Sequence, residues 1–253
     1  MFFSFIDLAK IVLISYATDR EFRLSKVRFE LQAKNFFNFD KIKIYGPDDL
    51  PKDFAMKYES ILARKRGAGY WIWRIKLIED ELKQLNYGDI LLFVDVGCIF
   101  KKKYLSKFHE LINTLKKSEK SILAFELSYP EKKHTKVEIF DFFNISKSSW
   151  IRESKQLQAT VLFLKKTENL NKYVYTYLKA ISEEPELITD KLWKEQESIF
   201  KENRHDQSLH SVICKLTNIS IIIPDFLNHR KTPIMATRLR DVKMLKIIDQ
   251  HFE

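Results

Sequence analysis

The chain has few of the residues that interrupt or cross-link a polypeptide. Its 253 residues include only five Gly, six Pro and two Cys. The Gly and Pro residues are scattered, and we find no internal repeat or low-complexity segment, so no flexible linker marks a domain boundary. We therefore predict one domain over residues 1–237, followed by a basic amphipathic helix over residues 238–253.

Long apolar runs and a cysteine framework are also missing. Cys98 and Cys214 lie in or beside apolar segments without the spacing of metal ligands, which suits a reducing compartment better than disulfides. No run approaches the ~20 apolar residues that a membrane-spanning helix needs. Asp7 and Lys10 interrupt the apolar residues 1–17, which lack a cleavage site, so we expect no signal peptide. The expected location is the cytoplasm.

The net charge of +10 at pH 7 points to an anionic partner. Nucleic acid, acidic lipid and a phosphorylated small molecule all fit this charge. Lysines are scattered through nearly every segment, so much of the excess charge can equally belong to a solvated surface. The basic stripe of residues 238–252 would pack on its own domain or, in the alternative, contact an anionic membrane surface.

The hydrophobic pattern predicts an α/β fold. The first two predicted strands, residues 10–16 and 41–45, are separated by the helical pattern of residues 21–37. They form a β-α-β unit, so we expect a mostly parallel sheet flanked by helices. Apolar runs of strand length lie within residues 10–16, 41–45, 88–98, 121–127, 159–164 and 219–223. Helical spacing covers residues 21–37, 70–85, 170–181 and 208–216.

The segment GDILLFVDVGC, residues 88–98, carries the carboxylate of Asp95 out of an apolar run into a glycine-containing turn. In open α/β sheets ligands bind beyond the carboxyl ends of the strands, where a carboxylate can hold a divalent cation against phosphate oxygens. The alternative is that Asp95 only caps the turn, since Asp and Gly are common turn residues. By itself the segment supports both interpretations equally.

The segment RKRGAGYWIWR, residues 64–74, places basic residues and two glycines before the start of a helix. Glycines let backbone N–H groups approach an anion, and a helix N-terminus favours phosphate. The segment is not a P-loop, because the Gly-Lys-Ser/Thr ending is absent. The alternative is a charged loop before a helix whose tryptophans, Trp71 and Trp73, belong to the core.

The segment NRHDQS, residues 203–208, is polar and precedes an apolar helical pattern. His205, Asp206 and Gln207 would line a pocket, with Asp206 placed for catalysis or for binding a substrate hydroxyl. The alternative is that Asp206 or Ser208 serves as the helix N-cap.

The segment NHRK, residues 228–231, follows the last predicted strand. Such a position can place His229 beside a metal ion and Arg230 beside a diphosphate. Carboxylates, a histidine and cations on strand-end loops would suit a nucleoside diphosphate sugar with Mg²⁺ or Mn²⁺, which would stabilise the leaving diphosphate.

The order of these motifs resembles that of bacterial glycosyltransferases of the GT-A fold. The resemblance is to enzymes of polysaccharide or lipopolysaccharide synthesis with a YWxWK segment and an aspartate-x-glycine variant of the DxD motif, and it spans residues 11–231. The motifs, in order, are RGAGYWIWR, GDILLFVDVGC, HTK at residues 134–136, QLQAT at residues 156–160, RHDQS and NHRK.

The resemblance implies a GT-A, Rossmann-like sheet and a set of site residues. Asp206 and Asp95 would be catalytic, and Asp95 and His229 would hold the metal ion. Two departures are Gly97, at the second acidic position of DxD, and Arg74, where relatives commonly have Lys. The residues implied to bind the donor are Ser15, Tyr16, Ala17, Arg66, Tyr70, Trp73, Arg74, Asp95, Gly97, Gln158, His205, Gln207, Arg230 and Lys231.

The function implied is transfer of a hexose from a nucleotide sugar, a UDP-sugar before others, to a hydroxyl of a surface glycan or a lipid-linked acceptor, with peripheral contact at the inner membrane. Two alternatives remain. A nucleic-acid-binding protein fits the charge, but Asp95 and Asp206 would repel phosphates. A sugar nucleotidyltransferase would normally show a Gly-rich signature near the first strand, and ISYATDREFR has none.

Overall fold

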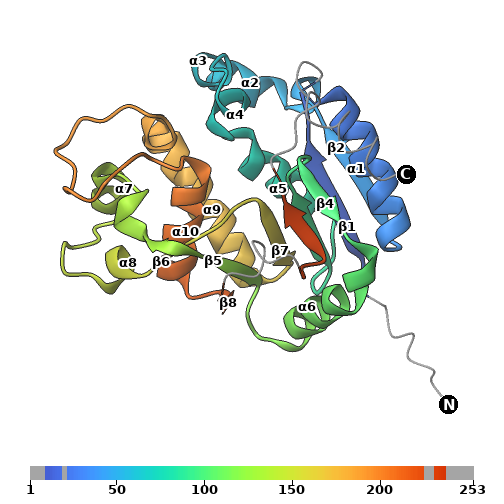
Figure 1. Cartoon of the computed structure of the whole chain (residues 1–253). Helices are drawn as coiled ribbons and strands as arrows, with labels where there is room; N and C mark the ends of the chain where they lie inside the picture. Colours follow the sequence, from blue (N-terminus) through green and yellow to red (C-terminus); the bar gives the residue numbers. More distant parts are fainter. Residues whose placement is uncertain (1–8, 19–21, 225–230, 238–253) are drawn as a thin grey trace.

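The computed structural model describes residues 9–18, 22–224 and 231–237. Its centre is a seven-stranded sheet with the order β2-β1-β3-β7-β5-β6, in which β8 pairs with β5 (Figure 1). Strands β1, β2, β3, β5 and β8 run in one direction, and β6 and β7 run in the other. The strands are β1 (Ile11–Tyr16), β2 (Lys41–Tyr45), β3 (Ile90–Val94), β5 (Ile122–Pro130), β6 (Lys155–Leu157), β7 (Val161–Lys165) and β8 (Ser220–Ile223).

The expected α/β fold with a mostly parallel sheet flanked by helices is confirmed. β1 and β2 pair in parallel and are joined by α1 (Arg23–Phe36), as the β-α-β pattern predicts. β3 lies on the other side of β1, also in parallel. β7 enters antiparallel to β3, and this brings the start of β7 to the edge at which β1 and β3 end.

Helices cover both faces of the sheet, and each face has its own core. Along β3 the side chains alternate, so that Leu91 and Phe93 face one layer and Leu92 and Val94 face the other. The first layer contains α5 (Trp73–Lys83), α9 (Glu168–Glu183) and α10 (Asp206–Thr217). The second contains α1 and α6 (Leu105–Lys117). The predicted helices over residues 170–181 and 208–216 correspond to α9 and α10.

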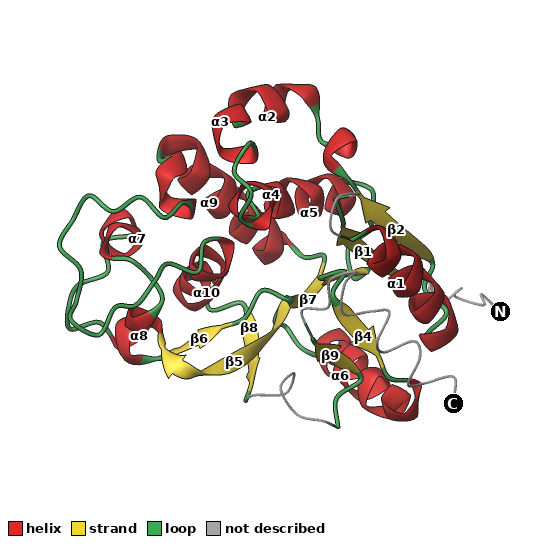
Figure 2. Ribbon diagram, turned by 45° about the horizontal axis from the view of Figure 1, so that its top comes forward, coloured by secondary structure: helices red, strands yellow, loops and turns green. Residues whose placement is uncertain are grey.

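Shorter elements complete the described part of the chain. A second sheet pairs β4 (Cys98–Phe100) antiparallel with β9 (Ile234–Ala236) next to α6 (Figure 2). The others are η1 (Pro47–Asp49), α2 (Lys52–Lys57), α3 (Glu59–Leu62), α4 (Gly67–Tyr70), η2 (Lys102–Tyr104), η3 (Glu131–Lys133), α7 (Val137–Phe142), α8 (Trp150–Glu153) and η4 (Pro185–Ile188). No helix in the described part of the chain is both long and apolar enough to span a membrane.

The structure corrects several predicted bounds. The helix expected from residue 70 begins at Trp73, because Tyr70 and Trp71 have φ values of 54° and 60° and cannot belong to a right-handed helix. The strand expected over residues 121–127 continues to Pro130. The predicted helix over residues 238–253 lies outside the described residues.

Candidate active site

The turn that carries Asp95 is fixed from two sides of the sheet edge. The Asp95 N–H donates to the carbonyl of Thr160, at the start of β7, over 2.9 Å. Arg28 of α1 donates to the carbonyls of Val96 and Cys98, each over 2.6 Å. The backbone of the turn is therefore held in place while the Asp95 side chain remains 32% exposed.

Arg74 joins the two predicted catalytic carboxylates. Its Nη2 donates to Oδ1 of Asp95 over 2.7 Å, and its Nη1 donates to Oδ2 of Asp206. The Arg74 and Asp206 side chains are 6% and 7% exposed. Charge-assisted hydrogen bonds between a guanidinium and carboxylates are among the stronger polar contacts in proteins. Three residues from α5, the end of β3 and the start of α10 thus form one polar cluster, here called the Arg74 bridge.

The Arg74 bridge rests on a closely packed apolar base. The guanidinium lies 4.6 Å from the centre of the Phe93 ring, and the Tyr177 hydroxyl donates to the Asp206 carbonyl over 3.1 Å. Beside Arg74 and Asp206 lies a cavity of about 10 Å³, which is also lined by His210. Such a volume holds about one water molecule. Burial lowers the pKa of His210 to about 3, so this histidine is neutral at pH 7.

The segment before α5, which includes the short element α4, is a left-handed turn rather than a regular right-handed helix. All five residues from Gly67 to Trp71 have positive φ values, between 49° and 94°. A Cβ atom on Gly67 would lie 2.3 Å from Cε3 of Trp71, so only glycine fits under the indole. The Trp73 Nε1 donates to the Gly67 carbonyl over 3.0 Å, and the Trp73 ring stacks on Tyr16 at 3.8 Å. The turn is therefore built around two tryptophans.

The anion-binding hypothesis for residues 64–74 needs backbone N–H groups that are free to bind an anion. The backbone N–H groups of residues 68–72 all donate to nearby backbone carbonyls, so they are already used. The side chain of Trp73 is buried, at 3% exposure, and its ring is not available to stack on a nucleic-acid base.

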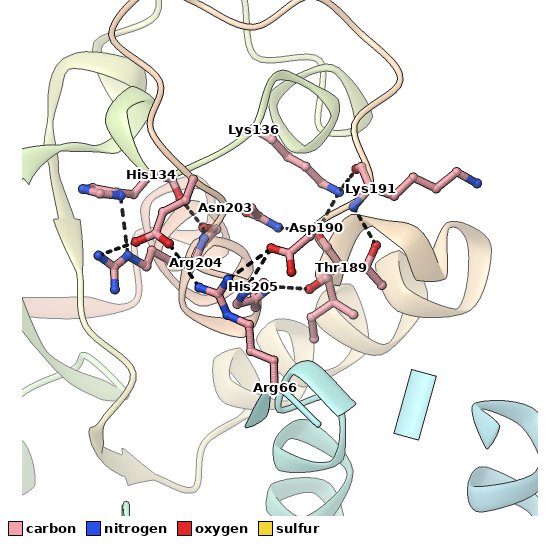
Figure 3. Close-up of polar contacts among 12 residues, drawn as sticks. Arg66, His134, Lys136, Thr189, Asp190, Lys191, Asn203, Arg204 and His205 are labelled. Carbon is pink, nitrogen blue, oxygen red and sulfur yellow. Dashed lines mark hydrogen bonds and ion pairs between the residues drawn. The ribbon is translucent and has the colours of Figure 1, made fainter. Parts of the chain in front are cut away.

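A second polar cluster lies along the segment that joins η4 to α10 (Figure 3). Arg66 points into it and pairs with Asp190 at 3.4 Å and Glu202 at 3.2 Å. Arg204 pairs with the other oxygen of Glu202 at 2.7 Å. The Arg66 side chain is 42% exposed, so these pairs are solvent-screened and individually weak.

Lys136, which directly precedes α7, holds this segment by hydrogen bonds. It is fully buried, and its Nζ donates to the carbonyls of Glu186, Thr189 and Lys191 at 2.7, 3.2 and 2.8 Å (Figure 3). Burial lowers the pKa of Lys136 to about 8. One ammonium group thus bonds to three carbonyls of this irregular segment. The Glu186 carbonyl also accepts from the Thr189 N–H, and the Thr189 carbonyl also accepts from Asn203.

His205 connects the two clusters, because it directly precedes Asp206. Its Nδ1 lies 2.8 Å from the Ile188 carbonyl, and its ring lies 4.7 Å from that of Tyr70 and 5.8 Å from that of Trp71. Burial lowers the pKa of His205 to about 4, so it is neutral at pH 7 and donates from Nδ1.

The structure brings together Arg74, Asp95 and Asp206, and it also brings Tyr70 against His205 and Tyr16 against Trp73. Most of the other predicted residues have different surroundings. Ser15 is fully buried and donates to the Val94 carbonyl over 2.7 Å. Lys231 lies beside α6, where its carbonyl accepts from Lys107. His229 and Arg230 lie outside the described residues. The remaining residues are Tyr16 under Trp73, Ala17 bonded to the Tyr45 carbonyl, Gly97 bonded to the Thr237 hydroxyl, Gln158 buried beside β5, and Gln207 bonded to Gln156.

The sequence did not predict four residues of the two polar clusters and their surroundings, which are Arg28, Tyr177, Asp190 and Glu202. Arg28 falls within a helical pattern and resembles a solvated surface cation. Asp190 and Glu202 stand in an irregular segment without a motif. Their contacts span 124 and 136 residues of sequence, so no local signal identifies them.

The donor atoms that the structure describes do not fit a divalent cation. Asp95 and Asp206 are both bonded to Arg74, and Gly97 replaces the second acid of a DxD motif. Within residues 9–18, 22–224 and 231–237, no group of three His, Cys, Asp or Glu side chains could hold a metal ion. Mg²⁺ and Mn²⁺ prefer several oxygen ligands in a regular arrangement.

Comparison with protein-family models and with curated proteins gives no match. Solved structures similar to this chain include a glycosyltransferase involved in the glycosylation of the major capsid of PBCV-1, with a TM-score of 0.46 and 10% identity over 85% of this chain and 82% of the other. They include mouse xyloside xylosyltransferase 1, with a TM-score of 0.47 and 11% identity over 85% of each chain.

A third is the galactosyltransferase LgtC in complex with donor and acceptor sugar analogs, with a TM-score of 0.39 and 10% identity over 83% of this chain and 72% of the other. TM-scores below 0.5 do not establish a shared function.

Proposed function

We propose that this protein is a GT-A-type glycosyltransferase that transfers a hexosyl group from a nucleoside diphosphate sugar, with UDP-sugar as the first candidate, to a hydroxyl group of a surface glycan or a lipid-linked acceptor. The observation that supports this most is the Arg74 bridge, which lies where β3 ends at the edge of a mostly parallel sheet. This edge is where open α/β sheets bind their ligands.

The Arg74 bridge has the chemistry to bind a sugar ring. Asp95 and Asp206 supply carboxylate oxygens that accept hydrogen bonds from sugar hydroxyls, and Arg74 places a positive charge beside both. A carboxylate beside the anomeric carbon also stabilises the positive charge that develops there as the bond to the diphosphate breaks. We assign Asp95, one-third exposed, to contact the donor sugar directly, and Asp206 to orient it.

The same proposal covers the other partners. Arg230 stays our candidate for the diphosphate, and a lipid-linked acceptor would place the enzyme in the cytoplasm at the inner membrane surface, with the basic residues 238–253 in contact with it. A nucleic-acid-binding function is less well supported, since Trp73 is buried and carboxylates lie at the sheet edge.

The test is a thermal-shift and calorimetry panel of UDP, GDP, CMP and their sugars, because a ligand that binds only the native state raises its melting temperature. We expect one nucleotide sugar to stabilise the protein more than the nucleotide alone. Asp95→Asn should remove that sugar-dependent increment while nucleotide binding remains. Asp53→Asn, an exposed position on α2, is the matched control and should behave like the wild type. A panel without any stabilising nucleotide sugar would reject the proposal.

A further inference from the structure

We propose that Arg74 is the built-in cation of the site: its guanidinium fills the space between Asp95 and Asp206 and keeps a divalent cation out of it. Two carboxylates that converge on a sheet edge are the usual surroundings of a metal ion. Here both converge on one side chain of the chain itself, through separate nitrogens of the same planar group.

The guanidinium has little freedom to leave this position. Arg74 belongs to α5, its side chain is 6% exposed, and its head lies 4.6 Å from the centre of the Phe93 ring. Withdrawal would leave the Asp206 carboxylate, 7% exposed, without a cation. Breaking a buried ion pair in this way costs several kcal/mol, so a cation would have to bind strongly to displace Arg74.

A cation that left Arg74 in place would find few ligands. Oδ1 of Asp95 and Oδ2 of Asp206 already accept from the guanidinium. Gly97 supplies no carboxylate where a DxD motif has its second acid. Within the described residues no third acidic, histidine or cysteine side chain completes a site. The chemistry of the donor set therefore favours a guanidinium over Mg²⁺ or Mn²⁺.

One consequence rests on the proposed function. Donor binding would not be linked to a divalent cation, and the charge of the leaving diphosphate would be met by side chains of the chain. The cation-free site itself does not depend on that function, because it concerns the protein without any nucleotide. The absence of a divalent cation from the site and the binding of a nucleotide sugar can therefore be tested separately.

The first experiment measures Mn²⁺ binding to the chelator-treated, nucleotide-free protein by electron paramagnetic resonance. The wild type should leave Mn²⁺ free at concentrations where Arg74→Met takes up one ion per chain, because this variant opens the space between two carboxylates. Arg74→Met combined with Asp206→Asn should lose that uptake. Tight Mn²⁺ binding by the wild type, or no uptake by a folded Arg74→Met protein, would overturn the proposal.

The second experiment measures UDP binding to the wild type by calorimetry in EDTA and in excess Mn²⁺. We expect dissociation constants that agree within about threefold, whereas a cation that bridges protein and diphosphate would change them by about tenfold or more, equal to about 1.4 kcal/mol. If Arg74→Met fails to fold, the wild-type arms decide alone. If UDP fails to bind under both conditions, the proposed UDP-sugar donor is wrong, and the Mn²⁺ measurement still judges the role of Arg74.

Discussion

Loss of the Asp206 carboxylate should destabilise the fold by an amount that the geometry of the Arg74 bridge sets. Removing one partner of a buried ion pair costs about 3–5 kcal/mol. In Asp206→Ala the guanidinium keeps Asp95 at 2.7 Å, and that carboxylate is 32% exposed and remains hydrated. We therefore expect about 2–4 kcal/mol, which lowers the melting temperature by about 4–16 °C for a domain of this size.

Arg74→Met should cost more than Asp206→Ala, because it removes the guanidinium that bonds to both carboxylates. The double variant should cost less than the two single losses together, since the second substitution removes a charge that the first has orphaned. Urea unfolding followed by circular dichroism gives all three values. Asp206→Asn, which keeps an oxygen acceptor for Arg74 and loses the charge, should fall between the wild type and Asp206→Ala.

Two results would refute this reasoning. The first is an Asp206→Ala protein within about 0.5 kcal/mol of the wild type, which is the range of an ordinary surface substitution. The second is a double variant whose loss equals the sum of the single losses, which would mean that Arg74 and Asp206 act independently.

Further outcomes follow from individual contacts. Burial lowers the pKa of His210 to about 3, whereas an unfolded histidine titrates near 6.5. The contribution of His210 to the free energy of unfolding should therefore be constant above about pH 6.5. Below that pH the free energy of unfolding should fall towards pH 3 by up to about 1.4 kcal/mol per pH unit. Urea midpoints between pH 7.5 and 5 check this, and His210→Gln should show the shallower slope. Gly67→Ala would place Cβ 2.3 Å from Trp71 and should cost about 1–3 kcal/mol, read from thermal melts. Lys136→Met removes the ammonium group that bonds to the carbonyls of Glu186, Thr189 and Lys191, and it should speed hydrogen exchange in that segment but not in β3.

The longer elements of the fold could be predicted from local pattern alone. β1 and β2 are apolar or alternating runs bounded by turn residues, and α1 has helical spacing between them. The three-residue strands β4 and β9 could not be predicted in this way. Their pairing joins Phe100 to Ile234 across more than a hundred residues, and residues of both strands belong to the core layer that contains α1 and α6.

The site could be predicted in part for the same reason. Asp95 follows an apolar strand and Asp206 begins an amphipathic helix, so each leaves a local signal. Arg74, the partner of both carboxylates, leaves no such local signal. Arg74 bonds to residues 21 and 132 positions away, and the resemblance implied only that it binds the donor. The ion-pair partners of a charged residue are set by the folded backbone, so the local sequence does not predict them.

The segment of residues 64–74 gains a different meaning from its place beside the Arg74 bridge. Arg74 is the second residue of α5, so the point at which the helix starts decides where the guanidinium lies. That start is set by the left-handed turn, through Gly67 under Trp71 and the bond from Trp73 to the Gly67 carbonyl. Left-handed backbone costs about 1–2 kcal/mol for each non-glycine residue, and such strain persists where the surrounding structure needs it. The glycines of this segment therefore serve to position a cation of the chain, and Gly67→Ala should weaken sugar binding as well as stability.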